Sequence, residues 1–207
     1  MRVGVFGGTF DPIHLGHLLT AEQCREQAEL DQVLFVPAAL PPHKQGQSLT
    51  SFAQRVEMLA LAISGHPSFL IDELEKDRSG PSYTVDTLTE MRRQRPDDEL
   101  GFIIGSDSLN ELATWYQPKR ILELATLLVV ARGDWPTFTA QELKNNLQLS
   151  DDFPLRYRVV SMPLITLASR DIRRRIAEGR SARYMIPRAV EAYIADKGLY
   201  RAYQPEA

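Results

Sequence analysis

The chain contains 207 residues, of which 43% are hydrophobic and 25% are charged, and its formal net charge is −3. These proportions are ordinary for a globular protein and predict a single domain, residues 1–207, with a sizeable core. The net negative charge does not indicate a basic surface that would bind a nucleic-acid backbone. No apolar run reaches the roughly 18 residues of a membrane span. We therefore expect no nucleic-acid partner, no membrane association and a cytoplasmic location, while composition specifies no oligomeric state.

Strand-like and helical patterns alternate along the whole chain. Apolar runs predict strands at residues 3–6, 33–37, 69–72, 101–104, 127–131 and 159–163. Amphipathic patterns predict helices at residues 18–28, 52–64, 85–95, 106–112, 119–124, 169–177 and 187–196. Such alternation predicts an α/β fold with a parallel sheet and right-handed crossovers. The single cysteine, Cys24, falls in the first of these helices and is expected in the core.

Ligands of parallel sheets bind beyond the carboxyl ends of the strands. The expected sheet therefore gathers five segments at one edge, namely residues 7–17, 37–44, 73–84, 105–107 and 131–133. Residues 38–50 contain Pro, Gly and Gln, which predicts a mobile loop, and residues 133–154 are expected to form a surface excursion.

The string GGTFDPIHLGH, residues 7–17, is the most specific motif in the chain. Gly7 and Gly8 end an apolar run and are expected to let the backbone turn without a Cβ near a ligand. His14 and His17 are three residues apart, so on a helix they share one face. The N–H groups of that helix start favour phosphate. A metal site built on the two histidines is an alternative, although no Cys or further His lies nearby in the sequence.

A second group of polar residues lies in LASRDIRRRI, residues 167–176. Ser169 is expected to cap a helix, and Arg173 lies four residues later on the same face. A guanidinium beside a helix N-terminus suits phosphate oxygens. Arg174 and Arg175 are interpreted as a solvated face of this helix.

Other candidates lie after the third, fourth and fifth strands. Ser82 or Thr84 is expected to cap the helix that follows, and Asp107 after Gly105 is placed to accept ribose hydroxyls. Arg132 is placed to contact a nucleotide. Residues taken as ordinary structure are Trp115, read by default as packing, and Arg55 and Glu57, read as surface positions.

GGTFDPIHLGH resembles the signature of the H-x-G-H nucleotidyltransferase superfamily and, in its full form, that of the bacterial nicotinate-nucleotide adenylyltransferases. The resemblance implies a single Rossmann-like, doubly wound parallel sheet flanked by helices. It also implies transfer of AMP from ATP to nicotinate mononucleotide, which gives deamido-NAD and pyrophosphate in NAD biosynthesis. Mg²⁺ is expected to arrive with ATP, with no fixed protein ligands.

The same resemblance assigns roles residue by residue. The implied catalytic groups are His14, His17 and Arg173. The implied ATP-binding residues are Gly7, Gly8, Thr9, Phe10, His14, His17, Gly105, Asp107, Arg132, Ser169 and Arg173. The implied residues for the mononucleotide are Gly8, Thr9, Lys44, Tyr83, Thr84, Trp115 and Tyr116, with Trp115 stacking on the pyridine ring and amides at Thr84 and Tyr116 meeting the carboxylate.

The second phosphate motif departs from the family's I-S-S/A-T-x-I-R pattern. Leu167 and Ala168 replace the usual Ile-Ser, and Arg170 stands where Thr is common, whereas Ser169 and Arg173 keep their positions. The remaining alternatives are another H-x-G-H transferase, such as pantetheine-phosphate adenylyltransferase or a cytidylyltransferase, and a non-catalytic nucleotide sensor on the same fold.

Overall fold

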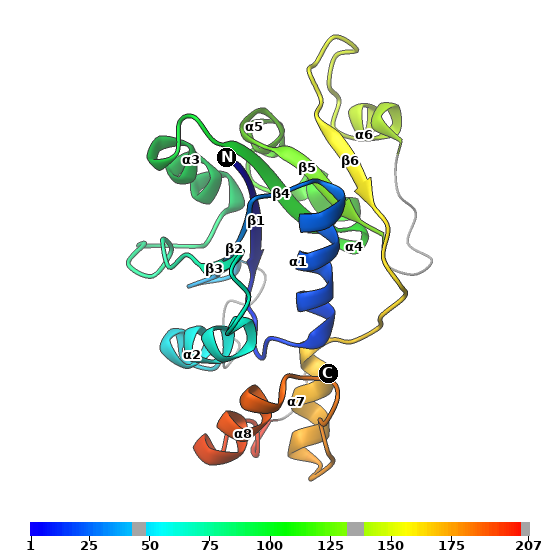
Figure 1. Cartoon of the computed structure of the whole chain (residues 1–207). Coiled ribbons are helices and arrows are strands. Elements are labelled where there is room, and N and C mark those ends of the chain that lie inside the picture. Colours follow the sequence, from blue (N-terminus) through cyan, green and yellow to red (C-terminus); the bar gives the residue numbers. More distant parts are fainter. Residues whose placement is uncertain (43–48, 132–138, 204–207) are drawn as a thin grey trace.

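The computed structural model describes residues 1–42, 49–131 and 139–203, and its centre is a six-stranded sheet in which every pair of neighbours is parallel (Figure 1). The strand order is β3-β2-β1-β4-β5-β6, the order of the doubly wound Rossmann fold. The strands are β1 (Arg2–Gly8), β2 (Gln32–Pro37), β3 (Phe69–Ile71), β4 (Glu99–Gly105), β5 (Thr126–Val130) and β6 (Tyr157–Val160). The expected α/β class and parallel sheet are therefore confirmed.

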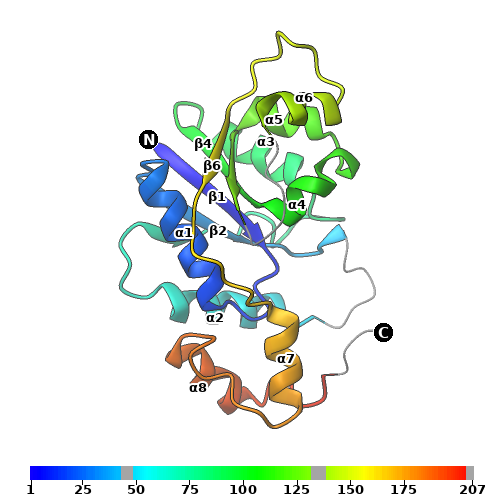
Figure 2. The ribbon, with the colours of Figure 1, turned by 90° about the vertical axis from the view of Figure 1, so that its right-hand side faces the viewer.

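Helices cover both faces of the sheet and its carboxyl edge (Figures 1 and 2). Those on one face are α1 (Leu15–Gln27) and α2 (Phe52–Ile63), and those on the other are α3 (Thr84–Gln94), α4 (Ser106–Glu111) and α5 (Pro118–Leu124). Beyond the strand ends lie α7 (Ser169–Ala177) and α8 (Arg188–Lys197). Within the described part of the chain, no helix is long and apolar enough to cross a bilayer.

The strands are apolar on both faces because both faces are covered. In β2, for example, Val33 and Phe35 pack on the side of α1 and α2, whereas Leu34 and Val36 pack on the side of α3 and α4. Cys24 of α1 is fully buried in the first of these cores, as expected, and burial raises the pKa of its thiol to about 12. The thiol is therefore inert packing rather than a nucleophile.

One helix that the sequence did not predict lies within the segment expected to form a surface excursion. α6 (Ala140–Asn146) begins at a capping box, in which the Thr139 side chain accepts from the Glu142 amide and Glu142 accepts from the Thr139 amide. Leu143 anchors the helix in the core. The sequence analysis placed no helix in this segment because a single buried leucine leaves almost no apolar periodicity to detect.

The strand order reverses between β1 and β4, which are direct neighbours although they are distant in sequence. The chain leaves β1 toward β2 on one side and leaves β4 toward β5 on the other. A crevice forms at such a switch point, outside the carboxyl ends of the two strands. The order of the strands therefore predicts a ligand site at the carboxyl ends of β1 and β4.

Candidate active site

A pocket of about 150 Å³ opens at this switch point. It is formed by the end of β1, the end of β4, the first turn of α4 and side chains of α1 and the segment after α4. The predicted residues that line it are Gly7, His17, Gly105, Asp107 and Trp115. Segments that are distant in sequence thus meet at one place, as the parallel sheet predicted.

The two glycines of the motif do not form a turn, which corrects the sequence interpretation. β1 continues through both, and Gly8 lies opposite Pro37 of β2. A Cβ on Gly8 would lie 2.9 Å from Cζ of Phe10, whose ring folds back over the strand end. A Cβ on Gly7 would meet no atom within 4 Å, and Gly7 lines the pocket. Gly8 is needed for packing, and Gly7 leaves backbone exposed to a ligand.

The two histidines cap helix α1 with each other's backbone. His14 is the N-cap residue, and its Nδ1 accepts from the His17 amide at 3.3 Å, while Nδ1 of His17 accepts from the His14 amide at 3.3 Å. The two rings stack with centroids 3.6 Å apart. Because each Nδ1 accepts a hydrogen, the neutral rings carry their proton on Nε2. In each ring, Nε2–H is therefore the hydrogen-bond donor.

Side chains from helix α7 hold the loop that joins β1 to these histidines. Arg173 Nη1 donates to the Asp11 carbonyl at 2.6 Å, and Ser169 Oγ donates to the Pro12 carbonyl at 2.9 Å. Ser169 is not the helix cap, because α7 takes Ala168 as its N-cap residue. The structure therefore brings both residues of the second motif to the predicted site, with hydrogen bonds to the loop backbone.

Arg55 was expected at the surface, and that expectation was wrong. Its side chain on α2 is 1% exposed, and Nη1 donates to the Thr9 carbonyl at 2.8 Å. Burial lowers the pKa of its guanidinium, while the charge of Asp11 opposes that shift. Its position three and four residues before the buried Met58 and Leu59 was a signal that would have predicted burial.

Asp11 is also buried and is held by the far end of the chain. Tyr200 donates its hydroxyl to Asp11 Oδ1 at 2.6 Å, and the Thr50 amide donates to Oδ2 at 3.2 Å. Tyr203 lies under Arg173, with the guanidinium carbon 4.6 Å from the ring centroid. No sequence pattern near either tyrosine indicates these contacts, because their partners lie 189 and 30 residues away.

The contact between Tyr200 and Asp11 predicts a dependence of stability on alkaline pH. Burial, and then the Asp11 charge, raise the pKa of Tyr200 above its ordinary value. Since the folded pKa exceeds the unfolded value of about 10, this group's stabilisation is complete below pH 10 and is lost as the pH rises further. Tyr200→Phe should lower the free energy of unfolding by about 1–3 kcal/mol at neutral pH and flatten its decline above pH 10. Urea titrations from about pH 7 to pH 11 test this; an unchanged alkaline slope would contradict it.

A second pocket of about 150 Å³ adjoins the first and is walled by aromatic rings. The ring centroids of Tyr83 and Tyr116 lie 4.8 Å apart, and Tyr116 is half exposed. Helix α3 begins at Thr84, with Tyr83 as the N-cap residue and no side-chain cap. Neither Ser82 nor Thr84 caps it, because the Ser82 hydroxyl accepts from the Leu40 amide and Thr84 is already the first residue of the helix. The first-turn amides of α3 consequently carry no side-chain acceptor.

Trp115 lines both pockets and separates them. Its ring packs edge-on against Phe102 of β4, with centroids 6.2 Å apart. Among the described residues, neither the buried Nε1 of Trp115 nor the buried Oδ1 of Asp107 has a hydrogen-bond partner. Buried polar atoms in folded proteins are nearly always satisfied, so these two are unusual in residues that line a pocket. The contacts of Trp115 are thus consistent both with packing against Phe102 and with ligand binding.

Two predicted site residues, Lys44 and Arg132, lie outside the described residues. Within the described ranges, no three His, Cys, Asp or Glu side chains are grouped so that they could hold a metal ion. The expectation that Mg²⁺ comes with ATP therefore stays a prediction.

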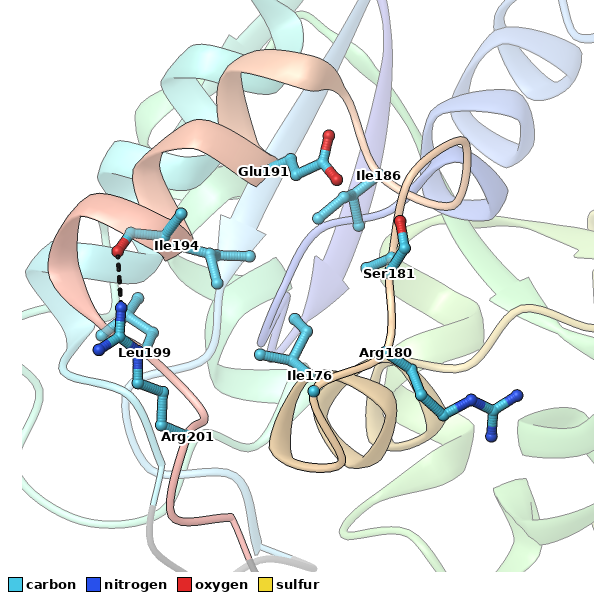
Figure 3. A pocket seen from close by; sticks show the side chains of 11 residues that line it. Ile176, Arg180, Ser181, Ile186, Glu191, Ile194, Leu199 and Arg201 are labelled. Atoms are coloured by element: carbon cyan, nitrogen blue, oxygen red, sulfur yellow. Dashed lines mark hydrogen bonds between the residues drawn. The ribbon is translucent and has the colours of Figure 1, made fainter.

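A third cavity, of about 260 Å³, lies between α7 and α8 and is separate from these pockets (Figure 3). Ile176, Ile186, Ile194 and Leu199 form its apolar walls. At its rim, Arg201 donates to the Ala195 carbonyl at 3.4 Å. The cavity adjoins the carboxyl end of α7, whereas Ser169 and Arg173 lie on its first turns, so we assign the cavity no part in the site.

Comparison with known proteins places this site in a class. The cytidylyltransferase-like family model matches residues 5–175, so the chain belongs to the cytidylyltransferase-like family. A relative from Thermomicrobium roseum, named probable nicotinate-nucleotide adenylyltransferase, is 49% identical and covers 98% of this chain and 93% of its own. A relative of the same name from Thermus thermophilus is 49% identical over 97% of this chain and 100% of its own. Within the family, the chain thus belongs with the nicotinate-nucleotide adenylyltransferases, which confirms the resemblance.

Solved structures agree on the fold. The nicotinic acid mononucleotide adenylyltransferase of Plasmodium falciparum, complexed with NaAD, superposes with a TM-score of 0.80 at 19% identity and covers 98% of both chains. A putative nicotinate-nucleotide adenylyltransferase of Vibrio parahaemolyticus gives a TM-score of 0.69 at 20% identity over the same shares. The Rossmann-like sheet is therefore the architecture of this class.

Proposed function

We propose that this chain, acting as one domain over residues 1–207, transfers AMP from ATP to nicotinate mononucleotide and releases pyrophosphate and deamido-NAD. The observation that carries the proposal is the pair of adjoining pockets that share Trp115, one beside His17 and the other beside the start of α3. The first suits a nucleotide's phosphates and ribose, and the second suits a flat, anionic ring. The product deamido-NAD joins two such groups in one molecule.

The reaction needs positioning and charge stabilisation rather than a base. The 5′-phosphate of the mononucleotide is already an anion and attacks the α-phosphorus of ATP in line. The Nε2–H groups of His14 and His17 donate to the phosphate oxygens as charge develops there. Arg173, held close to the loop by its bond to Asp11, supplies a cation for the leaving pyrophosphate.

A divalent cation completes this charge balance. Mg²⁺ bound to the triphosphate would neutralise the charge of the leaving group. We propose that it enters with ATP, coordinated by phosphate oxygens and water, because the described residues supply no acidic cage. The cytoplasm, where ATP is abundant, is the compartment in which we propose that the enzyme acts.

The acceptor pocket favours an acid over an amide. The first turn of α3 has no side-chain cap, and an anion at such a helix start gains from both free amides and the helix dipole. Side-by-side measurement of pyrophosphate release with ATP and either nicotinate or nicotinamide mononucleotide tests the function. We expect a higher kcat/KM for the acid. No release with either acceptor would leave a nucleotide-binding protein without transfer activity.

Trp115 gives a sharper test of the second pocket. Trp115→Ala should raise KM for nicotinate mononucleotide about 5- to 100-fold, because stacking of a base on an aromatic ring contributes roughly 1–3 kcal/mol. Trp115→Phe keeps a flat ring and should retain most of the affinity. Steady-state kinetics with ATP saturating measures both variants. Equal KM values for wild type and the alanine variant would assign Trp115 to packing against Phe102 alone.

A further inference from the structure

We propose that Arg55, on α2, is a positioning residue for adenylyl transfer, acting on the catalytic histidines through the loop that carries them. The inference rests on the proposed function, since it concerns the rate of that reaction. Arg55 is 1% exposed, so its guanidinium cannot touch a substrate in this conformation. Its hydrogen bonds instead go to the backbone of two loop segments.

The guanidinium joins two segments that are distant in sequence. Nη1 donates to the Thr9 carbonyl at 2.8 Å, and Nε donates to the Thr50 carbonyl at 3.0 Å. The Thr50 amide in turn donates to Oδ2 of Asp11, two residues after Thr9. Residues 9–14, which join β1 to α1, are called the catalytic loop below. Arg55, Thr50 and Asp11 therefore close a hydrogen-bonded ring around the first part of this loop.

The Thr9 carbonyl, which Arg55 holds, is directly followed in the chain by Phe10, whose ring packs against His17. Phe10 has a φ of +50°, a left-handed conformation that non-glycine residues adopt only where the surroundings hold it. Its ring packs edge-on against the His17 ring, with centroids 5.1 Å apart, and covers Gly8. A shift of the Thr9 carbonyl thus moves Phe10 and, through it, the imidazole. Misplacement of a reacting group by about 1 Å can cost about 100-fold in rate.

A planar fork is required for this task. Nε and Nη1 point in fixed, separate directions, so one side chain holds two carbonyls at a set spacing. A lysine ammonium keeps the charge but is a point donor on a flexible stem. The structure therefore distinguishes a geometric role of Arg55 from a purely electrostatic one.

The chain contains a matched control. Arg92 on α3 also bridges two backbone carbonyls, donating to Asp98 at 2.5 Å and to Leu124 at 2.6 Å. Both carbonyls lie just before the amino ends of β4 and β5, at the opposite edge of the sheet from the pockets. Loss of Arg92 removes the same kind of bridge without touching the catalytic loop.

The experiment compares Arg55→Met, Arg55→Lys and Arg92→Met with the wild-type chain by thermal unfolding and by pyrophosphate release. We expect Arg55→Met to lower kcat about 10- to 100-fold, with KM for both substrates within about threefold of wild type. Arg92→Met should lower Tm but keep the wild-type kcat per folded molecule. Arg55→Lys, which retains the charge, should recover stability but stay at least about fivefold below the wild-type kcat.

Three results would overturn the proposal: a wild-type kcat in Arg55→Lys, an equal kcat per folded molecule in Arg55→Met and Arg92→Met, or a rise in KM alone. Arg55→Lys decides the matter if Arg55→Met does not fold. Absence of turnover in the wild-type chain would instead count against the proposed function, so the two failures are distinguishable.

Discussion

Replacing His17 by alanine is expected to lower kcat about 10²–10³-fold while raising KM for ATP far less. The neutral ring of His17 carries its proton on Nε2 because Nδ1 accepts from the His14 amide. A donor that strengthens its bond as phosphate charge develops contributes mainly to the transition state, and the loss of one such donor typically costs this much. Steady-state pyrophosphate release, with each substrate varied in turn, measures the split. A near-normal kcat would remove His17 from the mechanism.

His14 permits the capping role and the chemical role to be separated. Its ring caps α1, so His14→Ala removes a helix cap, worth about 1 kcal/mol, together with the imidazole. Asparagine is among the strongest N-cap residues and retains an acceptor there. We therefore expect His14→Asn to unfold at nearly the wild-type temperature and yet to be as inactive as His17→Ala. Substantial activity in His14→Asn would show that capping is the whole contribution of His14.

The second large effect is expected at Arg173. Arg173→Met should lower kcat/KM for ATP about 10³-fold, since an arginine that neutralises a leaving phosphate group contributes on this scale. The same change leaves the Asp11 carbonyl without its donor and should lower the free energy of unfolding by about 1.5–3 kcal/mol. Kinetics below the unfolding transition, combined with urea unfolding, separates the two effects.

The matched control for Arg173 is its neighbour on α7. Arg174 is half exposed and pairs with Asp171 at the surface, 2.9 Å away. Exposed pairs of this kind contribute at most about 1 kcal/mol, so Arg174→Met should leave both kcat/KM and stability near wild type. If Arg173→Met loses stability but keeps kcat/KM for ATP within about threefold, then Arg173 acts only as a clamp on the loop.

The fold was predictable because the strands of a parallel sheet that is covered on both faces are continuous apolar runs in the sequence. The strand expected at residues 127–131, for example, differs from the observed β5 by only one residue at each end. What failed was local detail that depends on tertiary contacts. The strand continues through Gly8 because β2 pairs with it, and α6 forms because Leu143 finds a place in the core.

The position of His14 and His17 at the start of α1 was predictable because their motif lies in one short segment, while their catalytic roles stay predictions. The parts of the site that depend on contacts between residues distant in sequence were not predictable. Arg55 was assigned to the surface because arginine is rarely buried, and the carbonyls that compensate it lie 5 and 46 residues away. Tyr200 holds Asp11 across 189 residues, and no spacing rule links two such positions.

The place of Trp115 between the two pockets has a consequence for observing the enzyme at work. It is one of two tryptophans in the chain, the other being Trp135. An indole that forms part of both walls changes its surroundings whenever either pocket fills. In a Trp135→Phe background we therefore expect the emission of Trp115 to change when substrates bind and products leave. A stopped-flow instrument would then time these steps without any added label.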